Sequence, residues 1–129
     1  MLIDDSSFDL KIISRIVEHS GLFENILAFQ GGREALAYIK DNLDAEARRP
    51  QLILLDIQMP EMDGFEFIDE FALLPSSFRE KCRVAILSST DDITDISRVK
   101  SNPHLITLIR KPLHPDVLAK LVEKYYETE

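Results

Sequence analysis

Short apolar runs alternate with longer segments of helical periodicity along the whole chain. The runs predict five strands, at residues 1–3, 25–29, 52–55, 84–87 and 105–109. After each run, apolar residues recur every three or four positions, as they do on one face of an amphipathic helix. Several runs are continuously apolar rather than alternating, which is typical of strands that helices cover on both faces. The pattern therefore predicts five strand–helix repeats.

The predicted helices begin and end at recognisable signals. Ser6 and Ser7 can cap the first helix, and Gly21 can end it. A Pro-Ser-Ser sequence at 75–77 interrupts the third helix, and Pro115 stands at a favourable first-turn position of the last. We expect the apolar face of the first helix to contain Ile12, Ile13, Ile16 and Val17.

Strands and helices that alternate in this way form an α/β fold with a parallel sheet and right-handed crossovers. The chain has 129 residues, of which 45% are hydrophobic, enough for one domain with a substantial core. We therefore expect a single domain over residues 1–129. The first strand begins at Met1 itself, which suggests that upstream residues are missing from this sequence.

Charge and composition narrow the classes of function. The chain carries 15 Lys and Arg residues against 23 Asp and Glu residues, a net charge of −8, which argues against binding of nucleic acid by this domain. No apolar stretch reaches the roughly 18 residues of a membrane span, and no signal-peptide pattern opens the chain. A single cysteine, Cys82, excludes an internal disulfide, so a cytoplasmic location is expected.

Polar side chains stand where four of the predicted strands end. They are Asp4 and Asp5, Asp56, Ser88 and Lys111. Open α/β sheets bind ligands at the carboxyl ends of their strands. Three carboxylates gathered there would repel one another unless a cation intervened, and an oxygen-only ligand set favours Mg²⁺. With a hydroxyl donor, an ammonium group and one carboxylate left as nucleophile, the set suits phosphoryl transfer.

Each of these residues also has a simpler interpretation. Asp4 and Asp5 could cap the first helix, although neighbouring serines are available for that role. Asp56 could begin a turn, although it follows a buried run. Ser88 alone indicates a strand-end hydroxyl, and Lys111 alone a solvated lysine. Their placement at matching strand ends favours the functional interpretation.

Four motifs resemble the receiver domains of two-component response regulators, and together they extend over essentially the whole chain. The motifs are LIDDS at 2–6, LLDIQMPEMDG at 54–64, AILSS at 85–89 and RKPL at 110–113. The second, an apolar strand followed by D-x-x-M-P-x-M-D-G, is the most specific. The resemblance implies a flavodoxin-like (βα)5 fold, a doubly wound sheet of five parallel strands in the order 2-1-3-4-5.

The resemblance also implies roles for the residues at the strand ends. Asp56 would accept a phosphoryl group from a histidine kinase or a histidine phosphotransfer protein. Asp5 would bind Mg²⁺ directly together with Asp56, and Asp4 would support the ion, through water. The backbone carbonyl of Gln58 would be a further contact of the metal.

Beyond the metal, Ser88 and Lys111 would bind the phosphoryl oxygens. Position 90, which is Thr90 here, and position 58 influence the hydrolysis of the phosphoryl group in the family, and Ser89 lies beside them. An aromatic residue usually stands three positions before the lysine, where this chain has Leu108. In the family this aromatic side chain usually rotates on phosphorylation, and a leucine cannot reproduce that switch. The transmission of the signal is then expected to be damped or altered, unless Leu108 is simply a packing residue. The Lys111–Pro112 bond is a candidate for the cis form.

The predicted function is that of a bacterial signalling switch and not of an enzyme acting on other molecules. Phosphorylation would change the surface of the helix at 92–101, the fifth strand and the last helix, so a target protein would bind the 92–127 face. Phosphorylation could also produce a homodimer.

Several alternatives stay open at this point. A phosphorelay intermediate would pass the phosphoryl group to another histidine. A hydrolase with an aspartyl-phosphate intermediate would want an acid where Gln58 stands, and a degenerate receiver would lack site residues that are present here. No output domain is visible in 129 residues, so the chain is a stand-alone receiver, acting by protein contact, or part of a longer protein.

Overall fold

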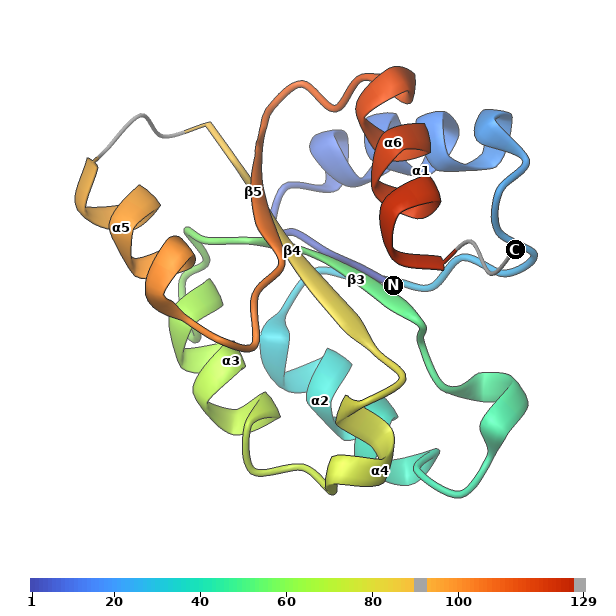
Figure 1. The fold of residues 1–129 in the computed structure, drawn as a ribbon, viewed down its shortest axis with the longest axis vertical. Helices are drawn as coiled ribbons and strands as arrows, with labels where there is room; N and C mark the ends of the chain where they lie inside the picture. Colours follow the sequence, from blue (N-terminus) through green and yellow to red (C-terminus); the bar gives the residue numbers. More distant parts are fainter. Residues whose placement is uncertain (90–92, 127–129) are drawn as a thin grey trace.

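A parallel sheet with helices on both faces forms the centre of the fold (Figure 1). The computed structural model describes residues 1–89 and 93–126, and its five strands pair in the order β2-β1-β3-β4-β5. The predicted doubly wound α/β sheet with strand order 2-1-3-4-5 is therefore confirmed. The strands are β1 (Leu2–Ile3), β2 (Ala28–Phe29), β3 (Leu52–Asp56), β4 (Arg83–Ser88) and β5 (Thr107–Arg110).

The helices form one layer on each side of the sheet. Figure 1 shows α1 and α6 over one face, and α2, α3 and α5 over the other. The short helix α4 follows α3, in the segment that the sequence marked as an interruption. The helices of the described residues are α1 (Ser7–Ser20), α2 (Gly32–Asp41), α3 (Gly64–Phe71), α4 (Ser76–Arg79), α5 (Ile93–Ser101) and α6 (Pro115–Tyr126), with a 3-10 helix η1 (Glu46–Arg48).

The central strand β3 connects two hydrophobic cores. All five of its residues are buried. Ile53 and Leu55 belong to the core beneath α2 and α3, while Leu52 and Leu54 belong to the core beneath α1 and α6. Successive side chains of a strand point to opposite faces, so a strand covered on both sides has to be apolar throughout. This explains why the run at 52–55 does not alternate.

Three strands are shorter than the sequence predicted, and β1 lacks only Met1 of the predicted range 1–3. β2 contains only Ala28–Phe29, because its partner β1 offers two residues for pairing, Leu2 opposite Ala28 and Ile3 opposite Phe29. β5 begins at Thr107 and not at Leu105, because the N–H of Leu105 donates to the carbonyl of Asn102 in a turn.

The predicted apolar face of α1 is wrong at one position. Ile12 is 40% exposed, whereas the buried residues of the helix are Leu10, Ile13 and Val17. These three are spaced three and four residues apart and so lie along one stripe. Ile12 is turned about 100° from Ile13 around the helix axis, away from the sheet.

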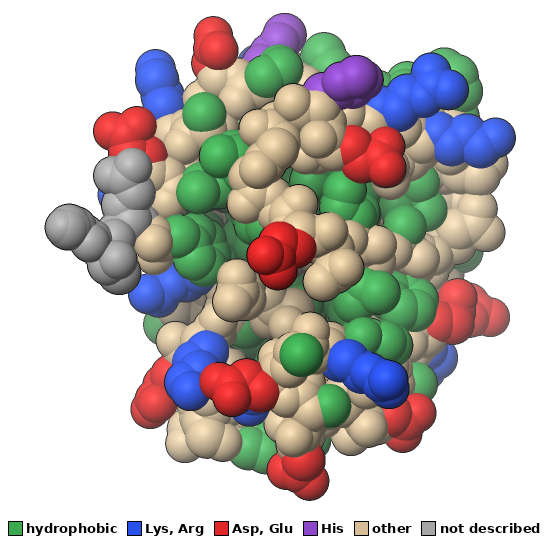
Figure 2. Space-filling model, turned by 90° about the vertical axis from the view of Figure 1, so that its right-hand side faces the viewer, with side chains coloured by type: hydrophobic (Ala, Val, Ile, Leu, Met, Phe, Trp, Pro, Cys, Tyr) green, Lys and Arg blue, Asp and Glu red, His purple; other side chains and the backbone are tan. Residues whose placement is uncertain are grey.

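The face of the molecule in Figure 2 carries side chains of both charge signs. On the face in Figure 2, acidic, basic and apolar side chains are interspersed, so this face does not concentrate the acidic excess of the chain. Across residues 1–89 and 93–126, no helix combines the length and the apolar character that crossing a membrane requires.

Candidate functional site

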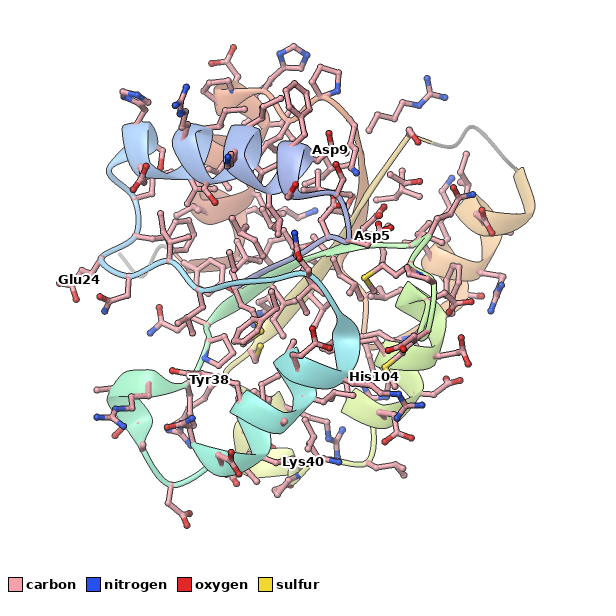
Figure 3. The ribbon with its side chains drawn as sticks, turned by 180° about the vertical axis from the view of Figure 1, so that it is seen from behind. Asp5, Asp9, Glu24, Tyr38, Lys40 and His104 are labelled. Carbon is pink, nitrogen blue, oxygen red and sulfur yellow. The ribbon has the colours of Figure 1, made fainter. Side chains whose placement is uncertain are left out.

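Three aspartates meet at the carboxyl edge of the sheet. Ile3 of β1 pairs with Leu55 of β3, so the next position along each strand brings Asp4 level with Asp56. Asp5 follows in the loop to α1, and carboxylate oxygens of the three aspartates lie within 4.8 Å of one another. Asp4 and Asp56 are buried and Asp5 is exposed, so the cluster opens to solvent on one side. Figure 3 shows Asp5 and Asp9 where the chain passes into α1.

Asp4 uses both of its carboxylate oxygens within the protein. Its Oδ1 accepts a hydrogen bond from the backbone N–H of Ser6 at 2.9 Å, and its Oδ2 accepts one from Lys111 Nζ at 2.7 Å. The simpler interpretation of Asp4 as a helix-start residue is thus correct in part, since it orders the entry to α1 while it also holds the lysine.

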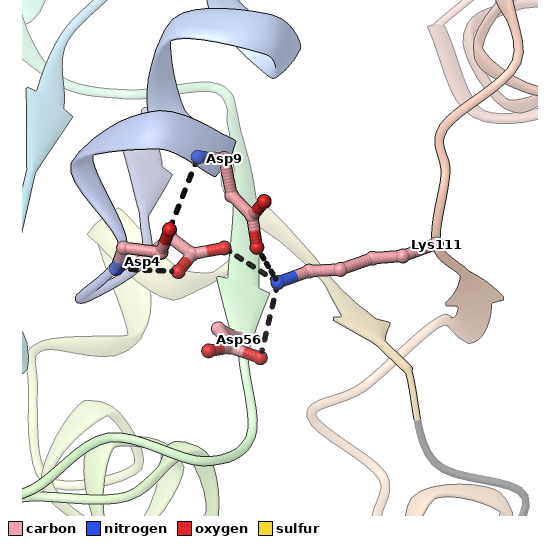
Figure 4. Close-up of polar contacts among 5 residues, drawn as sticks. Asp4, Asp9, Asp56 and Lys111 are labelled. Atoms are coloured by element: carbon pink, nitrogen blue, oxygen red, sulfur yellow. Dashed lines mark hydrogen bonds and ion pairs between the residues drawn. The ribbon is translucent and has the colours of Figure 1, made fainter.

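Lys111 lies among three carboxylates (Figure 4). Its ammonium donates to Asp4 at 2.7 Å and to Asp9 at 3.0 Å, and it lies 3.7 Å from Asp56 Oδ1. Burial alone would lower the pKa of Lys111, but the hydrogen bonds with Asp4 and Asp9 and the nearby negative charges outweigh burial and raise that pKa. The lysine is therefore charged at any physiological pH.

Asp56 carries a negative charge that its surroundings only partly compensate. Burial, followed by the charge of Asp4, raises the pKa of Asp56 to about 6. Lys111 acts in the opposite direction but does not cancel these effects, Asp5 adds to them, and a hydrogen bond with the backbone of Gln58 opposes them. An additional cation beside Asp56 would stabilise the ionised carboxylate and so lower the pKa of Asp56.

Ser88 lies at the end of β4, beside the start of the loop that carries Lys111. Its side chain is buried, and its backbone carbonyl accepts a hydrogen bond from the N–H of Lys111 at 2.9 Å. Leu87, just before it, pairs with Asp56 in the sheet register. Ser89 is exposed, and Thr90 lies outside the described residues.

Leu108 and the cis peptide bond belong to β5 and the loop after it. Leu108 is partly buried and packs against the core beneath α2 and α3. This packing agrees with the interpretation of Leu108 as a packing residue of β5. The expected effect of Leu108 on the transmission of the phosphorylation signal stays a prediction. The Lys111–Pro112 peptide bond is cis, as expected.

The loop from β3 to α3 forms one wall of an open pocket of about 640 Å³ beside the aspartates. Gln58, which is exposed, lies in this wall, while Arg98 of α5 lies across the pocket. Gly64 closes the loop: its N–H donates to the Ile57 carbonyl at 2.8 Å. A Cβ at Gly64 would lie 2.8 Å from the backbone oxygen of Asp56, so this approach requires glycine.

Asp9 is the residue of the site that the sequence prediction missed. It stands in the first turn of α1, and its Oδ2 accepts the hydrogen bond from Lys111. Its spacing from Ser6 fits the S-x-x-acid signature of a helix start. That signature placed an acid at the edge of the sheet, but it did not reveal that the acid faces Lys111.

The donor set fits a hard divalent cation. Asp4, Asp5 and Asp56 supply only oxygen atoms, which is the chemistry that Mg²⁺ prefers. Asp5 is exposed toward the pocket, and burial together with the charges of Asp4 and Asp5 raises the pKa of Asp56. Both features favour a metal ion bound at the open side.

Comparison with known proteins gives a consistent result. The response regulator receiver domain family matches residues 1–123. A solved receiver protein from Dyadobacter fermentans is 36% identical, with a TM-score of 0.85 and coverage of 98% of this chain and 96% of that one. A two-component response regulator from Cytophaga hutchinsonii has a TM-score of 0.88 at 28% identity, with coverage of 95% and 92%.

A curated relative is similar over nearly the whole chain. The probable methanogenesis regulatory protein FilR2 of Methanothrix harundinacea is 27% identical over 127 residues, which are 98% of this chain and 80% of the relative. The resemblance seen in the four sequence motifs is thereby confirmed. This chain belongs to the response regulator receiver domain family.

Proposed function

We propose that the chain accepts a phosphoryl group on Asp56 from a histidine kinase or a histidine phosphotransfer protein. Receiver domains are signalling domains that interact with such proteins. The observation that carries the proposal is the position of Asp56, at the end of β3, between an oxygen-only cluster and the ammonium of Lys111 at 3.7 Å. A kinase partner of this kind implies a cytoplasmic location.

The chemistry follows from the charge of Asp56. A carboxylate oxygen attacks the phosphorus of the donor, a P–O bond forms, and the P–N bond to the donor imidazole breaks. The imidazole nitrogen keeps the electron pair of the broken bond. Because the pKa of Asp56 is about 6, its carboxylate is largely ionised and nucleophilic at neutral pH.

Receiver domains bind a divalent metal ion at an acidic pocket, and we infer that this chain uses Mg²⁺. Asp5, Asp56 and the backbone carbonyl of Gln58 would hold the ion, while Asp4 would support it through water. Both oxygens of Asp4 already accept hydrogen bonds, which favours this indirect role. When bound, the ion supplies positive charge that offsets the charge of the transferred group.

Ser88 and Lys111 are proposed to bind the phosphoryl oxygens. The ammonium of Lys111 is charged and close to Asp56, and a hydroxyl can donate to a phosphoryl oxygen. Ser88 and Lys111 also lie on adjoining segments, joined by the backbone hydrogen bond at 2.9 Å. Movement of one toward the phosphoryl group would therefore displace the other.

This coupling supports an output surface on α5, β5 and α6. Phosphorylation adds roughly −1.5 to −2 charge, and a shift of Ser88 toward it would move the loop that leads to α5. A downstream target protein would bind this surface. Ser89, Thr90 and Leu108 are proposed to tune the response, and homodimer formation on phosphorylation stays a prediction.

Mg²⁺-dependent labelling with acetyl phosphate tests the site. We expect the parent protein and Asp44→Asn, a change in an exposed loop, to be labelled. Asp56→Asn should not be labelled, and Asp5→Asn should need more Mg²⁺. Labelling retained in Asp56→Asn would contradict the assignment.

A second measurement separates the switch from the phosphorelay intermediate. The phosphorylated protein is mixed with a histidine phosphotransfer protein, and transfer to its histidine is followed against hydrolysis in buffer. Transfer that is faster than hydrolysis would favour the relay, and hydrolysis without transfer would favour the switch.

A further inference from the structure

The carboxylate of Asp9 occupies a hydrogen-bond donor of Lys111. This contact measures 3.0 Å and joins residues 102 positions apart in the sequence. Asp9 belongs to none of the four motifs that carry the family resemblance, and it comes from a helix rather than from a strand end. The four motifs therefore do not account for its place in the site.

The start of α1 explains why Asp9 is available to the lysine. Asp9 stands three residues after the N-cap Ser6, where an acid commonly accepts from the N-cap backbone N–H. α3 has that arrangement in full, with Glu66 Oε1 accepting from the N–H of Asp63 at 3.1 Å. In α1 the N–H of Ser6 donates to Asp4 instead, at 2.9 Å. Because Asp4 accepts the hydrogen bond from the N–H of Ser6, the Asp9 carboxylate does not accept it and can contact Lys111 instead.

The two hydrogen-bonded partners of Lys111 differ in how easily they can be given up. The Asp4 side chain is 3% exposed and the Asp9 side chain is 37% exposed. A carboxylate that loses its partner while buried pays the full cost of desolvation, whereas an exposed one is rehydrated. Separation of Lys111 from Asp9 therefore costs less than its separation from Asp4.

Resting on the function proposed above, we propose that Asp9 is a positioning residue that holds Lys111 before phosphorylation and yields it afterwards. An ammonium group has three N–H donors, and in this structure Asp4 and Asp9 engage it by hydrogen bonds while Asp56 lies farther away, at 3.7 Å. A phosphoryl group on Asp56 adds strong acceptor oxygens and negative charge next to this ammonium. The N–H group of Lys111 that donates to Asp9 then donates to the phosphoryl group instead, while the hydrogen bond from Lys111 to Asp4 persists.

Asp9 consequently slows the transfer of the phosphoryl group to Asp56 in two ways. It competes with the incoming phosphoryl group for Lys111, and its charge adds to the repulsion that an anionic donor meets at this acidic edge. Both effects depend on charge, so salt should weaken them. The size expected for one partly exposed ion pair corresponds to a change of about two- to fivefold in rate.

The test compares the parent protein with three variants in initial rates of Mg²⁺-dependent phosphorylation by acetyl phosphate, at low and high salt. Asp9→Asn removes the charge and keeps the shape, whereas Asp9→Glu keeps the charge. Glu66→Gln changes the equivalent position of α3 and controls for the loss of an acid from a first helical turn. We expect Asp9→Asn to react about two- to fivefold faster at low salt, with the gain reduced at high salt, while Asp9→Glu and Glu66→Gln stay near the parent rate.

A structure of the parent protein with Mg²⁺ and beryllofluoride gives the second readout. The distance from Lys111 Nζ to Asp9 should lengthen beyond hydrogen bonding, while the contact with Asp4 persists. The role of Asp9 alone would be overturned if Asp9→Asn were phosphorylated no faster than the parent protein. It would also be overturned if Lys111 in the beryllofluoride complex kept its contact with Asp9 and lost its contact with Asp4. A parent protein that is not labelled at all would overturn the proposed function as well.

Discussion

The guanidinium of Arg98 lies 3.7 Å from the centre of the Phe65 ring, and this contact joins α5 to α3 beside the proposed phosphorylation site. Phe65 is buried and Arg98 is exposed, so the cation covers an aromatic face at the rim of the pocket. The contact links the proposed output surface to α3, the helix that follows the loop after Asp56.

Replacement of this cation should loosen α5. We expect Arg98→Gln to lower the free energy of unfolding by about 0.5–1 kcal/mol, the usual worth of an exposed cation–π contact. Amide hydrogens of α5 should exchange faster, as measured by hydrogen–deuterium exchange. Lys100→Gln, at an exposed position of the same helix, serves as the control. Equal exchange in the two variants would show that the ring contact does not hold α5.

Removal of the charge of Asp56 should stabilise the protein at neutral pH. The pKa of Asp56 is raised from 3.8 to about 6 in the folded protein, so its favourable contribution to folding is present below about pH 4 and is lost as the pH rises to 6. After allowance for solvent screening, Asp56→Asn should raise the free energy of unfolding at pH 7.5 by about 1 kcal/mol. Urea unfolding at pH 7.5 and at pH 4 measures the difference.

The same experiment with millimolar Mg²⁺ provides a check. The ion should stabilise the parent protein more than Asp56→Asn, because the variant lacks one of the proposed ligands. An Asp56→Asn variant that is less stable than the parent without Mg²⁺ would contradict the excess of negative charge described for the site.

Gly64→Ala should damage the site through the backbone. The new Cβ would lie 2.8 Å from the Asp56 oxygen and 3.0 Å from Ile57 Cα, and neither backbone atom can move aside alone. We expect a loss of about 1–3 kcal/mol in the free energy of unfolding and slower labelling by acetyl phosphate. Gly32→Ala is the matched control, because the nearest neighbours of its Cβ would be side-chain atoms, Met62 Sδ at 3.0 Å and the Phe67 ring at 3.3 Å. Equal effects of the two changes would argue against a tight turn at Gly64.

Cys82 should make the protein less stable in alkali. Burial raises the pKa of this thiol from 9.0 to about 12. The folded pKa lies above the unfolded one, so the contribution is complete below about pH 8.5 and is lost as the pH rises toward 12, with a slope of up to about 1.4 kcal/mol per pH unit. Urea unfolding of the parent and of Cys82→Ala between pH 7.5 and 9.5 isolates this slope. Parallel curves would contradict the prediction.

The sequence was sufficient to predict the sheet and the gathering of polar groups at its edge, because both follow from simple geometry. A continuous apolar run such as 52–55 requires cover on both faces, and parallel strands present their carboxyl ends at one edge. Asp4, Asp5 and Asp56 meet there for that reason.

Other features depend on contacts that no local pattern encodes. The direction of the Asp9 side chain depends on Asp4 having taken the N–H of Ser6, a choice settled in three dimensions. The length of β2 depends on how many residues β1 offers. Ile12 is as apolar as Ile13, and only the orientation of α1 on the sheet decides which of them is buried.

The brevity of β2 has a consequence for how molecules of this protein behave together. An edge strand with many unpaired N–H and C=O groups can recruit a strand from another chain and begin aggregation. β2 is an edge of the sheet and has only the two residues Ala28–Phe29. Two residues offer too few backbone N–H and C=O groups for a strand of another chain to pair with. Even at high concentration, molecules of this protein are therefore protected from intermolecular β-pairing at the β2 edge.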